Sequence, residues 1–183
     1  MSLDTKILDR PDRQAVALLA AAPPPEVAQA VLSFCDQWHA EGDVDFERLL
    51  FAGAAVGRSK HAGIDAVVLL WFDAAPSHDR LLIAAWFLFG YWRSAEAVHR
   101  DAWVRLAEAL DQLDRSSLAY VGTLCALDAV LVSPAPLLEG DRDWLRSFLN
   151  QRIEELRRLG MHEEMITQMT APRPSRPPAG GRR

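Results

Sequence analysis

The sequence predicts an all-α, single-domain protein: an irregular helical bundle or α/α array of about eight helices around a buried central helix at residues 78–92. Two observations predict this class. Apolar residues recur at spacings of three and four along most of the chain, which is the period of helices with one buried face. Proline, glycine and capping residues interrupt the pattern at intervals typical of helices, and no segment shows the alternation expected of a half-buried strand.

The most apolar part of the chain is residues 64–92, where residues 73–76 (DAAP) separate two apolar segments. Residues 81–92 carry no charge and would be apolar around the whole circumference of a helix. Such a helix belongs in a protein core or a bilayer. Because it is shorter than the roughly 20 residues that span a membrane, we expect a buried core helix with Ser77 as its N-cap.

Proline, glycine and N-cap residues mark the ends of the other helices. Pro11 suits the first position of a helix, Asp43 or Asp45 can cap another, and Ser94 can cap the amphipathic helix that follows the central one. Gly160 is typical of a helix C-terminus. The expected helices are residues 11–22, 26–39, 46–57, 64–72, 78–92, 95–113, 118–132 and 141–159.

The domain is expected to span residues 11–170, after a flexible segment at 1–10 and before a disordered Pro/Arg/Gly-rich tail at 171–183. Gly53 and Gly57 indicate tight packing against the central helices or a frayed helix end. Helix pairs recur about 35–40 residues apart, as in stacked hairpins, but no tetratricopeptide register can be aligned.

The charge is distributed unevenly. The chain carries −5, and removing the four arginines of residues 171–183 leaves −9 on residues 1–170. An acidic body argues against binding along a nucleic-acid backbone, and it is compatible with a partner that has a basic surface. Only Lys6 and Lys60 are lysines among the 20 basic residues, a bias typical of GC-rich bacterial genomes.

Two cysteines, Cys35 and Cys125, lie among apolar neighbours without CxxC spacing, and residues 1–10 lack the apolar core of a signal peptide. This favours buried free thiols in a reducing compartment, and therefore the cytoplasm.

The sharpest metal signal is Glu96-Ala-Val-His99, an ExxH motif that would place a carboxylate and an imidazole on one helical face. Di-iron bundles use two such motifs with two further glutamates. Here the nearest companion is Asp36-Gln-Trp-His39, a DxxH motif with a weaker ligand set. A helical-bundle metalloprotein that binds its metal through Glu96, His99, His39 and Asp36 is therefore an alternative function. The simpler interpretation of the motif is an exposed ion pair between Glu96 and Arg100. We expect no cofactor.

Other reactive combinations have structural interpretations. Ser77-His78-Asp79 cannot converge as a catalytic triad does, since its members are adjacent at a helix start. Cys35 and His39 lie one turn apart, although a core cysteine beside a boundary histidine explains them. Asp73 and Asp128 adjoin apolar segments and would need partners such as Arg80 or Arg93. We therefore assign no catalytic residue.

Six tryptophans are many for 183 residues, and tryptophan is enriched at interface hot spots. Those in the more polar helices are interface candidates, together with a methionine stripe that could form an adaptable binding surface. The candidates are Trp38, Trp103, Trp144, Met161, Met165 and Met169.

The sequence thus favours a cytoplasmic, non-enzymatic interaction protein: an adaptor, an accessory or chaperone-like factor, or an immunity-type inhibitor. Its partner would be another protein, and self-association into a homo-oligomer is compatible with the same features. The alternatives are the metalloprotein and a small-molecule-binding domain with an apolar cavity beside Trp86 and Tyr91. Nucleic-acid binding is disfavoured, because only the four tail arginines support it.

Overall fold

The computed structural model describes residues 3–9, 11–42 and 45–170, with side chains through Thr167. This part of the chain is helical and contains no strand. Its helices are α1 (Lys6–Asp9), α2 (Arg13–Ala21), α3 (Pro24–Glu41), α4 (Phe46–Arg58), α5 (Ile64–Ala74), α6 (His78–Ser94), α7 (Arg100–Leu110), α8 (Leu118–Val132), α9 (Glu139–Leu159) and α10 (Glu163–Thr170). The predicted all-α class is confirmed.

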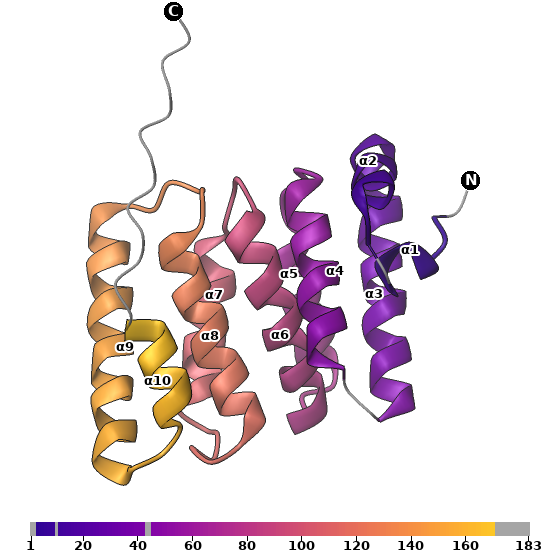
Figure 1. The fold of residues 1–183 in the computed structure, drawn as a ribbon. Coiled ribbons are helices and arrows are strands. Elements are labelled where there is room, and N and C mark those ends of the chain that lie inside the picture. The colour runs from indigo at the N-terminus through magenta and orange to yellow at the C-terminus, as the bar shows by residue number, and fades with distance from the viewer. Residues whose placement is uncertain (1–2, 10, 43–44, 171–183) are drawn as a thin grey trace, which may run out of the picture.

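The helices form a two-layer array (Figure 1). α4, α6 and α8 lie side by side in the front layer, with α2 beside α4 and α10 against α8 and α9. α5 and α7 lie behind them, and α3 packs on α5 and α6. α5, α7 and α9 begin 36 and then 39 residues apart, so the chain stacks helical hairpins of the spacing predicted from the sequence.

α6 is the centre of the array, as predicted. It contacts α3, α4, α5 and α8, and its side chains from Ile83 to Ala85 and from Tyr91 to Trp92 are completely buried. Ser77 caps it, because the Ser77 hydroxyl accepts a hydrogen bond from Arg80 N at 3.2 Å.

Glycines allow α4 and α6 to touch backbone to backbone. A Cβ at Gly53 would fall on the Phe87 carbonyl oxygen, and a Cβ at Gly90 would fall on the Leu50 carbonyl oxygen. A Cβ at Gly57 would lie 2.5 Å from the Tyr91 carbonyl oxygen. The tight packing predicted for Gly53 and Gly57 is therefore confirmed, and the alternative of a frayed helix end is not.

Most predicted helix ends hold, and two at the N-terminus differ. Gly42 and Gly160 end α3 and α9 in the left-handed conformation, with φ of 71° and 64°. α2 begins at Arg13 rather than at Pro11, because the Asp12 carboxylate caps it by accepting from Ala15 N at 2.8 Å. Residues 6–9, which we assigned to the flexible segment, form α1, whose Leu8 is buried against the core.

The helix predicted over residues 95–113 is wrong at both ends. α6 continues to Ser94, residues 95–99 are not helical, and α7 spans only Arg100–Leu110. The physical reason is a tertiary hydrogen bond: the buried Asp65 carboxylate accepts from His99 N at 2.8 Å and holds that residue in an extended conformation.

The predicted Glu96/Arg100 pair within that helix is also replaced by pairs between segments. Glu96 pairs with Lys60 at 2.9 Å, Arg100 with Asp141 at 2.9 Å, and Arg105 with Asp73 at 2.8 Å. The predicted disorder of residues 171–183 lies outside the described residues.

Candidate interaction surface

α6 is not covered on all sides, contrary to what its uniformly apolar sequence predicts. Its residues Leu82, Trp86, Phe89 and Arg93, spaced three and four apart, follow one stripe along the helix. Leu82 is buried, Trp86 and Phe89 are half-buried, and Arg93 is exposed. The stripe therefore brings aromatic rings to the surface of the array.

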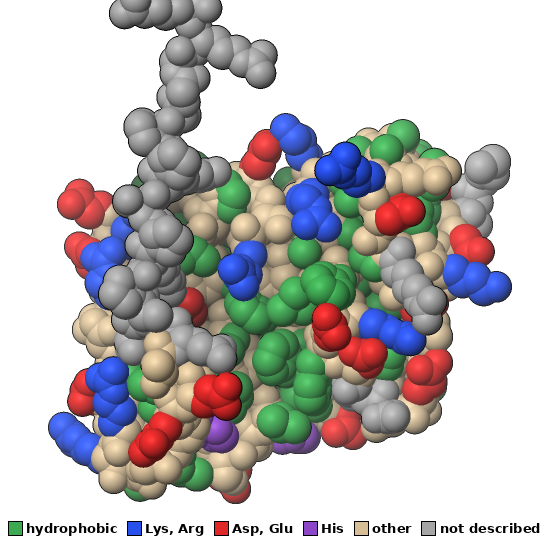
Figure 2. Space-filling model, in the orientation of Figure 1, with side chains coloured by type: hydrophobic (Ala, Val, Ile, Leu, Met, Phe, Trp, Pro, Cys, Tyr) green, Lys and Arg blue, Asp and Glu red, His purple; other side chains and the backbone are tan. Residues whose placement is uncertain are grey.

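These rings join one from α4 to make what we call the aromatic face: Phe46, Trp86 and Phe89. Phe46 and Trp86 are stacked with centroids 5.2 Å apart, and Trp86 meets Phe89 edge-on at 5.9 Å. The guanidinium of Arg93 lies 5.4 Å from the centre of the Phe89 ring. Figure 2 shows hydrophobic side chains gathered over the middle of the front layer.

Local structure positions each ring. Phe46 is the first residue of α4, whose N-cap Asp45 accepts from the backbone N–H groups of Glu47 and Arg48 at 3.1 Å each. Trp86 is oriented by α8, since a Cβ at Gly122 would lie 2.7 Å from the Trp86 Nε1 atom. The indole nitrogen, which has no hydrogen-bond partner, therefore points toward α8, and the face presents rings rather than polar atoms.

Two of the predicted interface tryptophans are core residues. Trp38 is 4% exposed and Trp103 is 1% exposed, so neither side chain offers a surface to a partner. Trp38 packs edge-on against Phe34 with Arg48 over its ring, and Trp103 packs against Trp144 with centroids 5.5 Å apart. The polar residues next to these tryptophans in sequence suggested exposed helices. The tryptophans themselves, however, lie on the sides of their helices that pack into the array.

The third candidate tryptophan, Trp144, is exposed: 48% of its surface is accessible to solvent. It stacks on Phe148 at 5.1 Å and forms a second apolar surface near the start of α9. Of the methionine stripe, Met161 and Met165 are half-buried against the core, and the Met169 side chain lies outside the described residues.

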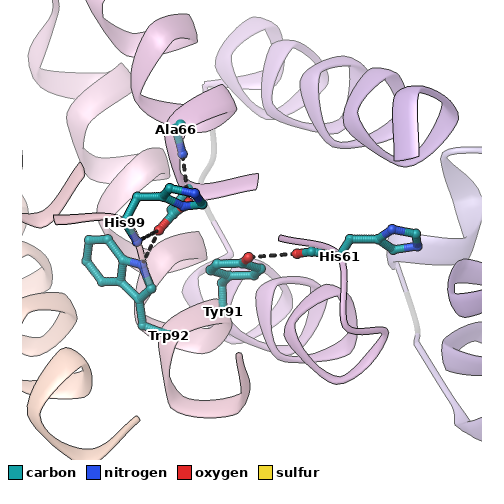
Figure 3. Close-up of polar contacts among 6 residues, drawn as sticks. His61, Ala66, Tyr91, Trp92 and His99 are labelled. Carbon is teal, nitrogen blue, oxygen red and sulfur yellow. Dashed lines mark hydrogen bonds and ion pairs between the residues drawn. The ribbon is translucent and has the colours of Figure 1, made fainter. Parts of the chain in front are cut away.

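A polar network that the sequence did not indicate surrounds Asp65 in the first turn of α5 (Figure 3). Its carboxylate is completely buried. Oδ2 accepts from Trp92 Nε1 at 3.1 Å and from His99 N at 2.8 Å, while Oδ1 lies 2.7 Å from His99 Nδ1. The sequence offered one sign of this network, an aspartate in a strongly apolar helix. It could not name the partners, because Trp92 and His99 lie 27 and 34 residues further along the chain.

The Asp65 network links three consecutive helical segments, α5, α6 and the start of α7. Beside it, the Tyr91 hydroxyl donates to the His61 carbonyl oxygen at 2.8 Å. Burial raises the pKa of Tyr91, and the nearby Asp65 carboxylate raises it further. With its hydroxyl neutral and engaged, Tyr91 serves as a structural donor.

The structure does not bring the four metal candidates together. Glu96 pairs with Lys60 and His99 with Asp65, whereas the Asp36 carboxylate accepts from Trp71 Nε1 at 2.6 Å and His39 packs on the same Trp71 ring. Glu96 and His99 also lack the common helix on which the motif depended. Among the described side chains, no group of three or more potential ligands is placed to hold a metal ion.

The two acidic residues next to apolar segments differ in exposure, and Asp73 has a partner other than the two that were expected. Asp73 is exposed and pairs with Arg105, while Arg80 donates to the Trp71 carbonyl oxygen at 2.7 Å. Asp128 is half-buried on α8, where its charge contributes to the raised pKa of Cys125.

The apolar cavity that a small-molecule site would need is not formed between Trp86 and Tyr91. Trp86 lies on the aromatic face, whereas Tyr91 is completely buried and borders a cavity of about 200 Å³ with Lys60 and Glu96. Pockets for drug-sized ligands are larger, about 300–1,000 Å³, and mostly apolar. The cavity beside Tyr91 is therefore smaller than such pockets and is not lined by Trp86.

Both cysteines are expected to be unreactive in the native protein. Burial, reinforced by Asp36, raises the pKa of Cys35 to about 12, and burial with Asp128 raises that of Cys125 to about 12. Since the thiolate is the reactive form, raising the pKa from about 9 to about 12 lowers its population at pH 8 by about a thousandfold. Ellman's reagent should titrate two thiols in urea and react far more slowly without it. Rapid native reaction of either thiol would contradict its burial.

Comparison with protein-family models, with curated proteins and with solved structures finds no match for this chain. Its class is therefore defined by its own geometry: a two-layer α/α array with a half-buried aromatic face on the front layer. No helix in the described ranges is both long and apolar enough to cross a membrane.

Proposed function

We propose that the protein works by binding another protein, and that the aromatic face of Phe46, Trp86 and Phe89 is the centre of its binding surface. One observation carries this proposal: residues 81–92 of α6 are apolar on every side, yet α4, α8 and the second layer leave Trp86 and Phe89 only half-buried. Aromatic side chains left in contact with water lose the stabilisation that burial provides, and contiguous apolar surface on a soluble domain marks interaction sites. The roles compatible with such a surface are adaptor, accessory or chaperone-like factor, and immunity-type inhibitor.

Charge supports a basic partner. Residues 1–170 carry −9, and charge complementarity steers association and suppresses wrong partners. The free thiols of the buried Cys35 and the half-buried Cys125 suit a reducing compartment, so we propose that this activity is cytoplasmic. A second copy of the chain is the other protein that could cover the face, which light scattering distinguishes from a different partner.

The test is affinity purification from the native host with the full chain and matched single variants. Phe89→Ser and Arg93→Glu alter the aromatic face, while Leu70→Ser alters an equally apolar residue that is 70% exposed on α5. Removing a hot-spot side chain costs at least about 2 kcal/mol, which is more than tenfold in affinity. We expect one stoichiometric protein with the wild type and Leu70→Ser, and strong loss with either face variant.

Circular dichroism and thermal melting must show that each variant is folded. Recovery of no protein by folded wild type, or equal loss with Leu70→Ser, would overturn the proposal. Loss with Trp144→Ser while both face variants still bind would move the site to the apolar surface of Trp144 and Phe148.

A further inference from the structure

The aromatic face has the chemistry of surfaces that take proline-rich segments. Such segments adopt an extended polyproline conformation at little entropic cost and lay their rings on aromatic side chains. Stacked and edge-on rings of Phe46, Trp86 and Phe89 provide a continuous apolar platform, and the Trp86 indole nitrogen is turned away from it. A ligand for this face needs apolar rings rather than a carboxylate or a phosphate.

The chain itself carries a segment of this composition. Residues 171–183 (APRPSRPPAGGRR) contain four prolines, four arginines and no acidic residue. We propose that residues 171–183 fold back in cis onto the aromatic face, with their prolines on the rings of Phe46, Trp86 and Phe89. This inference deepens the proposed function, since it rests on the same surface and names a Pro- and Arg-rich segment as the chemistry that the surface accepts.

The segment begins within reach of the face. It follows α10, which is anchored on α8 and α9 by the buried Ile166 and the half-buried Met165. α8 in turn adjoins α6. With helix axes about 8–10 Å apart, the face lies about 20 Å from α10. Thirteen residues in a polyproline conformation extend about 40 Å at roughly 3.1 Å per residue, so the segment can cross α8 and cover the rings.

Charge acts in the same direction. The segment carries four positive charges, and the rest of the chain carries −9. Acidic side chains border the hydrophobic area in Figure 2, and the exposed Glu47 adjoins Phe46 in sequence. Because Arg93 already lies over Phe89, the prolines rather than the arginines are expected on that ring, with the arginines directed to the acidic border.

The test is site-specific photo-crosslinking in the full chain. p-Benzoylphenylalanine replaces Phe89 in one preparation and Leu70, on the opposite layer, in a matched control. After illumination at low protein concentration, proteolysis and mass spectrometry locate the cross-links. Because a tethered segment has an effective concentration in the millimolar range, we expect cross-links from position 89 to residues 171–183 within one chain, at least about tenfold above those from position 70.

Two further full-chain variants test the chemistry. Replacing the four prolines of residues 171–183 with alanine should lower the yield from position 89, and so should replacing the four arginines with glutamine. High salt should lower it through screening as well. If the position-89 protein does not fold by circular dichroism, the label is placed at Phe46.

Equal yields from positions 89 and 70, or cross-links from position 89 to a second copy, would overturn docking in cis. Those results leave the proposed function standing if Phe89→Ser still abolishes partner recovery. Loss of both the cross-link and the partner dependence means that the aromatic face is not a binding surface.

Discussion

Gly90→Ala is expected to destabilise the fold by more than about 3 kcal/mol, at or beyond the upper end of overpacking costs. The added methyl would fall on the Leu50 carbonyl oxygen, with the Ala54 nitrogen 2.9 Å away. Both obstacles are backbone atoms of a regular helix, so no side-chain rotation relieves the clash. α4 and α6 would have to separate along their whole contact, and small domains have only about 5–15 kcal/mol of stability in total.

Gly140→Ala is the matched control for that variant. Gly140 also lies in a helix, but nothing stands within 4 Å of the position its Cβ would take. Replacing a helical glycine with alanine there should be neutral or stabilise by up to about 1 kcal/mol. Urea denaturation followed by circular dichroism measures both. Equal midpoints for the two variants would show that α4 and α6 do not touch at their glycines.

Asp65→Ala is expected to cost about 3 kcal/mol or more, because it leaves Trp92 Nε1 and His99 N buried or half-buried without an acceptor. Asp65→Asn should recover little of this loss, since its amide NH₂ group would face donors that the carboxylate now satisfies. Amide hydrogen exchange of residues 95–99 should also become faster, because their non-helical conformation depends on this carboxylate.

Asp73→Ala provides the comparison. Asp73 makes a close bidentate pair with Arg105, but both side chains are 37% exposed. Surface ion pairs contribute between about 0 and 1 kcal/mol, so this variant should melt close to the wild type. If Asp65→Ala proved equally mild, the Asp65 network would not hold α5, α6 and α7 together.

The sequence by itself determined the helical class, the central position of α6 and most of the helix boundaries. These depend on local chemistry: apolar periodicity, the Ser77 and Asp45 caps, and the glycines that end α3 and α9. The close contact at Gly53 could also be predicted, because consecutive small residues in one helix favour close approach of a neighbour.

Tertiary structure alone decided which faces remain exposed and which polar groups meet. The sequence favoured Trp38 and Trp103 for the surface and Trp86 for the core, whereas the structure buries the first two and leaves Trp86 half-buried, because exposure depends on where neighbouring helices pack. The end of α6 and the start of α7 were mispredicted because Asp65, 34 residues before His99, competes for its backbone N–H. Contacts of that separation are set by how the hairpins stack, and no local pattern encodes them. The aromatic face therefore depends on the tertiary structure: α4, α8 and the second layer cover most of the uniformly apolar α6 and leave Trp86 and Phe89 half-buried.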